Sequence, residues 1–450
     1  MKLTVRDFKS VSQVDRFEFA PLTVLAGVNS SGKTSLMQVL LLLKQTLGFD
    51  GKKPLQFQGP YLYADSLSDL IHGKYAKGTF IIGLELFADE IVNRNDFDKY
   101  LGFMGDHLTG IDLQVSFNAN GDVHVKEMRC QLQYGESGRE YLIVKRRNNL
   151  YDVSFSNVNM LGGVIDLQLV RRRRLVGCLL EFSNFLPLYV NTSADDGSRS
   201  YAMPVMKDLL TALTALFSNM EYLGPNRVEP ELAKGYKSLN FTNVGMRGEN
   251  TRFLLNQWKN RQIEGYAETL VQAVSRWVCD EMKMATSFDV VKDSNMLYRT
   301  VVVNNAGTKV DLIHMGFGLS QLLPIVVQGL LTPCGGMFVV VDPEVHLHPL
   351  VQGKLVDFFI ELEEHGRHVV VETHSDHIVT RLRRRIAEGR VVAERDVNLC
   401  YVENVEGKSQ YVSYGIDSQG SFTTELPKGF LDVQDEDYRA IIQAKLRGWQ

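Results

Sequence analysis

A glycine-rich stretch near the start of the chain has the residue types and spacing of a loop that binds phosphate. Residues 27–34, called the phosphate loop below, contain Gly27, Gly32, Lys33 and Thr34 in the pattern G-x-x-x-x-G-K-[ST]. Glycines let backbone N–H groups curl around an anion without Cβ clashes, and a helix that starts at Lys33 presents further unpaired N–H groups. We expect Lys33 to be an exposed charge that reaches the β- and γ-phosphates, and the Thr34 hydroxyl to bind Mg²⁺. The alternative is a glycine turn before an ordinary helix.

Three later stretches supply groups that a nucleotide site needs. An apolar strand ends in Asp342-Pro343-Glu344, which places a carboxylate beside Mg²⁺ or the attacking water. Another apolar strand ends at His374, which can reach the γ-phosphate or a water near it, although a histidine after a strand is more often structural. Residues 316–321, the second loop, read GFGLSQ and open a helix that can receive an anion. One nucleotide with two phosphate-facing loops predicts a dimer in which the second loop caps the partner's nucleotide.

The surrounding elements predict an α/β fold assembled from both ends of the chain. An apolar run precedes the phosphate loop, and the helix after it is apolar nearly all round, as in a helix buried against a sheet. Period-two alternation from about 110 to 195 predicts an antiparallel meander, and the period becomes helical from about 200 to 285. The phosphate loop and the later strands share one sheet only if the middle of the chain is an insertion.

The boundaries of these regions follow from the changes in pattern. The predicted regions are an N-terminal lobe (1–90), a β-rich insertion (91–199), a helical subdomain (200–295), a C-terminal lobe (296–400) and a small C-terminal domain (401–450). Strands of the meander are predicted at 111–117, 123–125, 130–134, 141–144 and 151–155, and strands of the tail at 399–402 and 410–413. On the predicted helix around 270–278, one face carries Leu270, Val274, Trp277 and Val278.

Bulk composition indicates a soluble, cytoplasmic protein. The 450 residues have a formal net charge of −4, which gives no overall attraction to nucleic acid or to anionic membrane. The five cysteines are scattered and never spaced C-x-x-C, which is typical of buried thiols in a reducing compartment. The N-terminus has no apolar signal-peptide core, and no membrane span is expected. Arg171 to Arg174 are interpreted as a solvated or partner-facing loop rather than a nucleic-acid patch, which is the alternative.

At these motifs the chain resembles bacterial AAA-family ATPases with ABC-type heads, relatives of the SMC, RecF and OLD proteins. The resemblance rests on GVNSSGKTS, GFGLSQLLP, VVVDPEVHLHP and VETHSDHIVTRLRRRIAEG, and SLSDLIHG is similar to the segment after the phosphate loop in SMC heads. The segments at 222–227, 244–249 and 426–432 look like landmarks of a subgroup that ends in a small domain of unknown function. The resemblance implies an ABC-type ATPase head with the cofactors ATP and Mg²⁺.

The resemblance also implies roles for individual residues. It makes the phosphate loop the Walker A loop, Asp342 the Walker B acid and His374 the switch histidine, and it makes the second loop a signature loop that acts in trans. Because Val341 stands where most relatives have a polar or acidic residue, Asp342 is either the acid on the Mg²⁺ side or the general base, with Glu344 the alternative base. The expected catalytic residues are Asp342, Glu344 and His374, and the expected metal ligands are Thr34 and Asp342. The expected nucleotide-binding residues are Gly27, Asn29, Ser30, Ser31, Gly32, Lys33, Thr34, Ser35, Gly316, Gly318, Ser320 and Gln321.

Other motif positions and the biological task follow in the same way. His346 and His348 would lie in the D-loop, and Gln56 and Gln58 are positional candidates for the Q-loop. The arginines at 381 and 383–385 would have a role inside the head or at an interface rather than in reading DNA. The resemblance implies a homodimer with ATP sandwiched between the heads, acting as a switch on a separate effector in anti-phage defence. The alternative is a RecF-like ATPase that binds DNA in repair, and a transporter ATPase is disfavoured.

Overall fold

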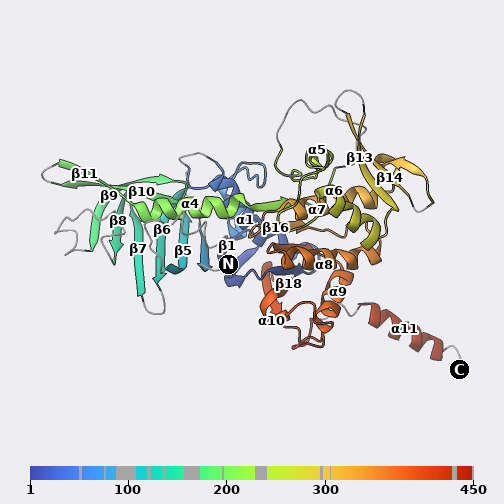
Figure 1. The fold of residues 1–450 in the computed structure, drawn as a ribbon. Helices are drawn as coiled ribbons and strands as arrows, with labels where there is room; N and C mark the ends of the chain where they lie inside the picture. Colours follow the sequence, from blue (N-terminus) through green and yellow to red (C-terminus); the bar gives the residue numbers. More distant parts are fainter. Residues whose placement is uncertain are drawn as a thin grey trace.

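The computed structural model describes residues 1–49, 53–74, 78–87, 108–118, 123–134, 138–156, 173–194, 197–228, 241–293, 297–304, 306–427 and 433–447. These residues form two large sheets, one small sheet and the helices that cover them (Figure 1). None of the described helices is long and apolar enough to cross a membrane.

The phosphate loop belongs to a six-stranded sheet that both ends of the chain build together. In sheet order the strands are β12 (Met220–Leu223), β16 (Met337–Val341), β17 (His368–Thr373), β3 (Leu22–Ala26), β18 (Val397–Val405) and β19 (Lys408–Tyr414). The first five strands are parallel, and β19 turns back antiparallel to β18. Because β3 pairs with β17 on one side and β18 on the other, the expectation that both halves share one sheet is confirmed.

Helices cover both faces of this sheet. They are α1 (Lys33–Leu47), α7 (Phe317–Leu331), α8 (Pro349–Glu364) and α9 (Asp376–Ala387). Successive residues of β16 point to opposite faces, so Val339 and Val341 enter the core that contains α1, whereas Phe338 and Val340 enter the core that contains α7 and α8. Strands covered on both faces are apolar at every position, which explains the unbroken run MFVVV.

Helix α1 is buried nearly all round. Every residue of α1 except Thr34, Gln38 and Lys44 is buried. The core that it enters also contains side chains of the second large sheet, so α1 is covered from both sides. The prediction of a buried helix directly after the phosphate loop is confirmed.

The second large sheet is antiparallel, has ten strands and extends to the left in Figure 1. Its strands are β1 (Lys2–Phe8), β2 (Val11–Glu18), β4 (Thr79–Phe87), β5 (Leu108–Asn118), β6 (His124–Tyr134), β7 (Gly138–Arg147), β8 (Leu150–Phe155), β9 (Arg174–Ser183), β10 (Leu186–Ala194) and β11 (Gly197–Ala202). From β4 to β11 each strand pairs with the next one along the chain, which confirms the predicted meander. The predicted strands at 123–125 and 130–134 form one strand, β6, with a register shift opposite residues 116–117.

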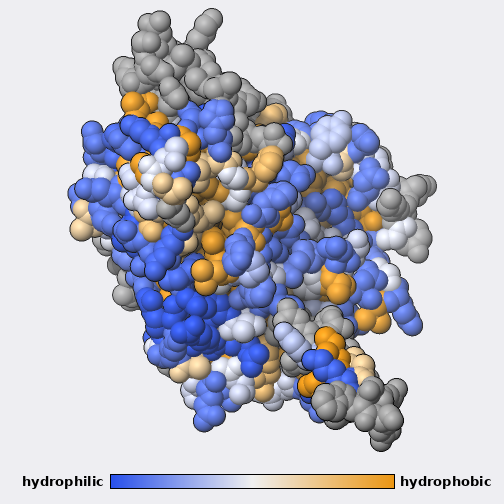
Figure 2. Space-filling view, turned by 90° about the vertical axis from the view of Figure 1, so that its right-hand side faces the viewer, coloured by the Kyte–Doolittle hydropathy of each residue, from blue (hydrophilic) through white to orange (hydrophobic). Residues whose placement is uncertain are grey.

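Helices and a small sheet make up the rest of the described chain. They are α4 (Pro204–Ser218), which lies along the ten-stranded sheet in Figure 1, α5 (Thr251–Gln257), α6 (Leu270–Ser275), a π-helical turn (Arg276–Glu281), β13 (Ser287–Asp293), β14 (Leu297–Val303), β15 (Lys309–Asp311), α10 (Ala393–Asp396) and α11 (Val433–Arg447). The predicted apolar face around 270–278 is buried, with Leu270, Val274 and Val278 at 0% exposure. Figure 2 shows the side of the molecule that is on the right in Figure 1, where hydrophilic residues cover most of the surface.

For two regions the sequence patterns do not predict which sheet the strands join. The predicted tail strands at 399–402 and 410–413 lie in β18 and β19, beside the strand that leads to the phosphate loop. The strands between 108 and 202 continue the sheet that starts with β1 and β4. The predicted fold class is confirmed: α/β, built from N- and C-terminal lobes with an inserted antiparallel region and a helical region.

Candidate nucleotide site

Three neighbouring parallel strands carry candidate residues at their carboxyl ends. The phosphate loop follows β3, the acidic turn (residues 342–344) follows β16, and His374 follows β17. Carboxyl ends of parallel strands lie at one edge of a sheet, where open α/β folds bind ligands. The structure therefore brings the phosphate loop, the acidic turn and His374 together.

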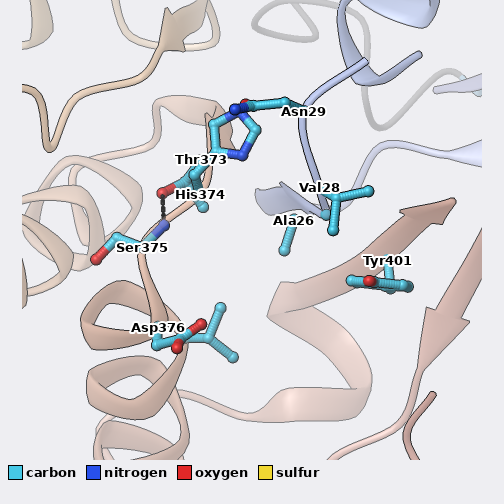
Figure 3. Close-up of a pocket in the computed structure, with 10 residues that line it drawn as sticks. Ala26, Val28, Asn29, Thr373, His374, Ser375, Asp376 and Tyr401 are labelled. Carbon is cyan, nitrogen blue, oxygen red and sulfur yellow. Dashed lines mark hydrogen bonds between the residues drawn. The ribbon is translucent and has the colours of Figure 1, made fainter. Parts of the chain in front are cut away.

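A cavity of about 520 Å³, the first cavity, opens beside the phosphate loop. Residues from the loop and from the segment after β17 line it. Figure 3 shows His374 and Asn29 among the residues that line this cavity, together with Tyr401 of β18. The two predicted residues Asn29 and His374 thus face the same space.

The two glycines of the motif are required by their surroundings. Gly27 has φ +149°, and a Cβ placed there would lie 2.2 Å from the carbonyl oxygen of Val402 in β18. Gly32 has φ +101°, and its Cβ would lie 1.9 Å from the hydroxyl of Ser409. The Tyr411 hydroxyl donates a hydrogen bond to the Gly32 carbonyl at 2.6 Å. The hairpin β18–β19 therefore holds the phosphate loop from behind.

We expect Gly27→Ala to lower the free energy of unfolding by about 2 kcal/mol or more, because the new methyl group meets backbone and the φ value suits only glycine. ATP binding should fall with it. Gly353→Ala in α8 is the matched control, since its Cβ meets only the Arg381 side chain at 3.8 Å, an ordinary contact. Thermal melting of both variants checks the prediction, which fails if the two variants melt together.

Lys33 is buried, and the expectation of an exposed lysine is wrong. Its side chain is folded back so that Nζ donates to the carbonyl oxygens of Gly27 at 2.9 Å and Val28 at 2.8 Å. The residue is 3% exposed, and this burial lowers the pKa of Lys33, while the charge of Glu372 acts in the opposite direction. The ammonium thus lies inside the curve of the loop and stabilises its shape.

Glu372, the second-last residue of strand β17, is a site residue that the sequence pattern did not reveal. Its Oε1 accepts a hydrogen bond from the Thr34 hydroxyl at 2.6 Å, and its Oε2 has no hydrogen-bond partner among the described residues. Burial raises the pKa of Glu372 to about 7. The available signal was an acid in an otherwise apolar strand, two residues before His374.

The acidic turn and His374 contact each other. The backbone N–H of His374 donates to Glu344 Oε1 at 2.6 Å, and His374 Nε2 lies 3.7 Å from Asp342 Oδ1. Burial raises the pKa of Glu344 and lowers the pKa of His374, which lies near the positive charge of Lys33. Because its pKa is lowered, His374 is a neutral imidazole at pH 7 and can donate one hydrogen bond. The backbone of Asp342 has φ +45°, a left-handed conformation rare for a non-glycine residue.

The oxygen atoms at this site fit a Mg²⁺ ion that a nucleotide brings. Within the described residues, Asp342 Oδ1, Glu344 Oε2 and Glu372 Oε2 are buried without a hydrogen-bond partner. Buried acceptors of this kind are costly unless a cation or donor meets them. Mg²⁺ commonly takes one or two carboxylates together with phosphate oxygens and water. Thr34 and Asp342, the predicted ligands, would hold it, with Glu372 beside Thr34.

The pKa of Glu372 predicts how binding of ATP with Mg²⁺ depends on pH. Between about 4.5 and 7 the folded chain holds a proton that the unfolded chain has lost, so the contribution of Glu372 to stability falls as pH rises through this window. The affinity for the metal changes in the opposite direction and rises with pH, because metal binding needs the ionised carboxylate. We expect the affinity to rise by up to about tenfold per pH unit below pH 7 and then to level off.

Titration of the chain with fluorescent ATP and Mg²⁺ at several pH values measures this slope. Glu372→Gln removes the titrating group and should make the affinity independent of pH near neutrality. The same titration with a chelator in place of Mg²⁺ is the control. A slope that survives in Glu372→Gln would contradict the assignment.

The remaining phosphate-loop residues divide into exposed and buried positions. Ser30 has φ +61° and is exposed, while Ser31 is buried and its hydroxyl lacks a partner among the described residues. The Ser35 hydroxyl lies 2.8 Å from the Ser10 hydroxyl. Ser35 therefore anchors the start of α1 to the ten-stranded sheet, and Ser30 is placed to meet a ligand.

The second loop lies at a different cavity. Gly316 caps α7, and a Cβ added there would meet nothing within 4 Å. Gln321 is buried, as is Ser320, whose hydroxyl donates to the Phe317 carbonyl at 2.7 Å. A Cβ at Gly318 would lie 3.2 Å from the His346 carbonyl oxygen. The cavity that the second loop borders, about 800 Å³ and called the second cavity, shares no lining residue with the first.

The structure also places four other motif positions. Gln56 and Gln58 line a third cavity at the C-terminal end of α1, away from the phosphate loop, so neither supports the positional assignment to the Q-loop. His346 has φ +62° and lines the second cavity. His348 caps α8, where its Nδ1 accepts from the Leu350 N–H at 3.3 Å.

Three arginines after His374 make hydrogen bonds within the chain. Arg381 and Arg385 both donate to Asp357 of α8, and Arg383 donates to the Gly420 carbonyl. Asp357 is 5% exposed, and burial opposes its charge while the two arginines lower its pKa to about 2. In the run 171–174, residues 171 and 172 lie outside the described residues, and Arg174 pairs with Asp152.

A comparison with protein families found a match in the part of the chain that carries the acidic turn and His374. Residues 229–379 match the family model of the AAA ATPase domain. This segment of the chain is therefore similar to the AAA ATPase domain. The matched segment includes the second loop, the acidic turn and His374, and a domain of this type implies nucleotide binding. A comparison with curated proteins gave no match.

Solved structures similar to the chain include SMC head domains. The SMC head bound to the C-winged helix domain of ScpA is 13% identical, with 92% of this chain and 97% of that chain covered and a TM-score of 0.43. The SMC head domain from Thermotoga maritima is 11% identical, with coverage of 92% and 97% and a TM-score of 0.35. The Smc head with an extended coiled coil, bound to the C-terminal domain of ScpA derived from Pyrococcus furiosus, is 12% identical, with coverage of 92% and 96% and a TM-score of 0.41.

Proposed function

We propose that the chain binds and hydrolyses ATP with Mg²⁺ and works as a nucleotide-dependent dimeric switch on a separate effector, in anti-phage defence. The observation that carries the ATPase part is the set of three unpartnered carboxylate oxygens, on Asp342, Glu344 and Glu372, around Lys33 and Thr34. A buried cation and buried acids around a loop of backbone N–H groups suit the charges of a metal-bound triphosphate. The defence role and the effector rest on the resemblance of the motifs.

ATP binding and hydrolysis would give each residue of the site a role. Lys33 would exchange the carbonyls of Gly27 and Val28 for phosphate oxygens, and Thr34 and Asp342 would hold the metal. Bound Mg²⁺ would neutralise charge on the β- and γ-phosphates. Glu344 or Asp342 would accept the proton of the attacking water. Neutral His374 would donate a hydrogen bond toward the γ-phosphate.

The placement of the second loop supports the dimer. It borders a cavity separate from the first, so it would serve a nucleotide presented from outside the chain. A head-to-tail pair makes that contact twice with one surface, as two-fold symmetry requires. ATP would then contribute to the interface, and dimerisation would tighten ATP binding by the same factor.

Mixing two inactive variants tests this arrangement. Lys33→Ala disables the phosphate loop, and Gly316→Asp places a carboxylate at the open N-cap of α7, where nothing lies within 4 Å to disturb the fold. A mixed dimer keeps one site made from two intact loops, so we expect part of the ATPase activity to return on mixing. Gly316→Ala, which adds a methyl group without charge, should stay active. No recovery in mixed dimers shown by pull-down would count against the trans arrangement.

A phage-challenge assay tests the biological part of the proposal. Cells that carry the chain with its neighbouring genes should resist infection, and Lys33→Ala should remove that protection. Equal plating with both chains would contradict the defence role without affecting the ATPase assignment.

A further inference from the structure

The second cavity contains positive groups that the proposed function does not use. Its lining includes Arg227, Arg247 and His346, and among the described residues it includes no aspartate or glutamate. The segment after β12, the loop before α5, the start of α7 and the turn after Glu344 enclose it. A space of this size with two guanidinium groups and no carboxylate on its lining favours an anion.

The guanidinium group of Arg227 is only partly hydrogen-bonded among the described residues. Its Nη2 donates to the carbonyl oxygens of Val341 at 2.9 Å and Asp342 at 3.1 Å. Its Nε and Nη1 are buried and have no hydrogen-bond partner among the described residues, although the side chain lines the second cavity. Arg227 is 5% exposed. Buried N–H groups of a cation without acceptors are costly, and an anion in the cavity would supply acceptors to the guanidinium group when it turns toward the cavity.

Other lining residues give the cavity the shape of a nucleotide site. Arg247 is exposed, and its Nε donates to the Asn226 carbonyl at 2.9 Å, which fixes the guanidinium group beside Arg227 in the lining. The Phe317 ring is 55% exposed, with its centroid 5.9 Å from that of the His346 ring. An exposed ring beside a phosphate site offers a surface on which a base can stack.

We propose that the second cavity binds a nucleotide, with its phosphates on Arg227 and Arg247 and its base on Phe317, and that Arg227 transmits this binding to the acidic turn. The nucleotide is either free or held by the phosphate loop of a second copy. The transmission follows from the bonds of Nη2 to Val341 and Asp342, since an anion that draws the guanidinium toward the cavity changes the support of those carbonyls. This second part rests on the proposed ATPase function, whereas the binding part does not.

Binding is tested in Lys33→Ala chains, whose own phosphate loop is disabled. Pyrophosphate and ADP are titrated by calorimetry into this chain alone, and in a second arm the chain is titrated with ATP-loaded Gly316→Asp chains with no further nucleotide added. Binding of the small ligands by the Lys33→Ala chain alone identifies a free nucleotide as the ligand, and binding only of the ATP-loaded chains identifies the nucleotide of a second copy. In either arm, adding Arg227→Gln or Arg247→Gln should weaken binding at least tenfold.

The controls separate charge from fold. Arg384→Gln removes the same charge from an exposed helix position away from the cavity and should leave binding unchanged. Arg247 is exposed, so Arg247→Gln keeps the test valid if Arg227→Gln fails to fold. Binding that both cavity substitutions leave unchanged, or no binding in either arm, would overturn the proposal. That result would leave ATP hydrolysis by the unmodified chain intact, whereas failure of the proposed function would remove it.

The coupling has its own readout. Arg227→Lys keeps the positive charge but not the two-edged geometry of the guanidinium group. If Arg227 positions the acidic turn, kcat for ATP should fall at least fivefold while KM stays within twofold. Equal changes in both, or none, would contradict a positioning role.

Discussion

Replacing Lys33 by alanine is expected to lower the affinity for ATP about a hundredfold, or about 3 kcal/mol, because a charge inside the phosphate loop is lost. The structure adds a second effect. Since Nζ bonds the carbonyls of Gly27 and Val28 and the side chain is 3% exposed, the variant should also melt at a lower temperature. Calorimetric titration with ATP and thermal melting measure the two effects separately.

The control for this variant lies in the same helix. Lys44 near the C-terminal end of α1 is a half-buried cation that, like Lys33, donates to a backbone carbonyl, here that of Phe217. Lys44→Ala should lower stability to a similar extent while ATP affinity stays close to that of the unmodified chain. Wild-type ATP affinity in Lys33→Ala would show that residues 27–34 are not the nucleotide site.

Asp342→Ala is expected to reduce ATP hydrolysis at least tenfold, which corresponds to about 1.4 kcal/mol in the barrier. Asp342 and Glu344 each have a buried oxygen without a partner in the described part of the chain, so either can receive the metal or the proton of water. The two roles predict different effects on the Mg²⁺ concentration that activity requires. Loss of a metal ligand should raise the Mg²⁺ concentration needed for activity, whereas loss of the base should lower kcat alone.

Comparison of Asp342→Asn with Glu344→Gln separates these roles. We expect the first to need more Mg²⁺ and the second to bind ATP with Mg²⁺ normally and turn over slowly. If Glu344→Gln turned over normally while Asp342→Asn lost kcat without a change in Mg²⁺ requirement, the base would be Asp342. Full activity in both would remove the acidic turn from the mechanism.

The sequence predicts those parts of the site that depend on backbone pattern. Glycines at 27 and 32, a following lysine, and acids at the end of an apolar strand are local features, and their positions along strands place them at one edge of the sheet. The fold class follows for the same reason, because period-two and period-3.6 patterns are local. For strand β6 the sequence pattern predicts two separate strands, because residues 126–129 do not alternate between apolar and polar side chains.

Features that depend on packing depth or on distant partners could not be predicted in this way. Nothing near Lys33 in the sequence shows that its side chain is buried, since β18 and β19 that cover the loop come from the other end of the chain. Glu372 lies in a buried strand, and only the pairing of β17 with β3 shows that it faces Thr34. Arg227 meets the carbonyl of Asp342 through the fold alone.

The contact of the hairpin β18–β19 with the phosphate loop sets an order of events during synthesis. Val402, Ser409 and Tyr411 contact or face Gly27 and Gly32, which have positive φ values. Tyr411 is synthesised 379 residues after Gly32. A growing chain that ends before β18 leaves one edge of β3 unpaired and the loop without its support. A nascent chain therefore gains a fully supported phosphate loop only after β18 and β19 have been synthesised.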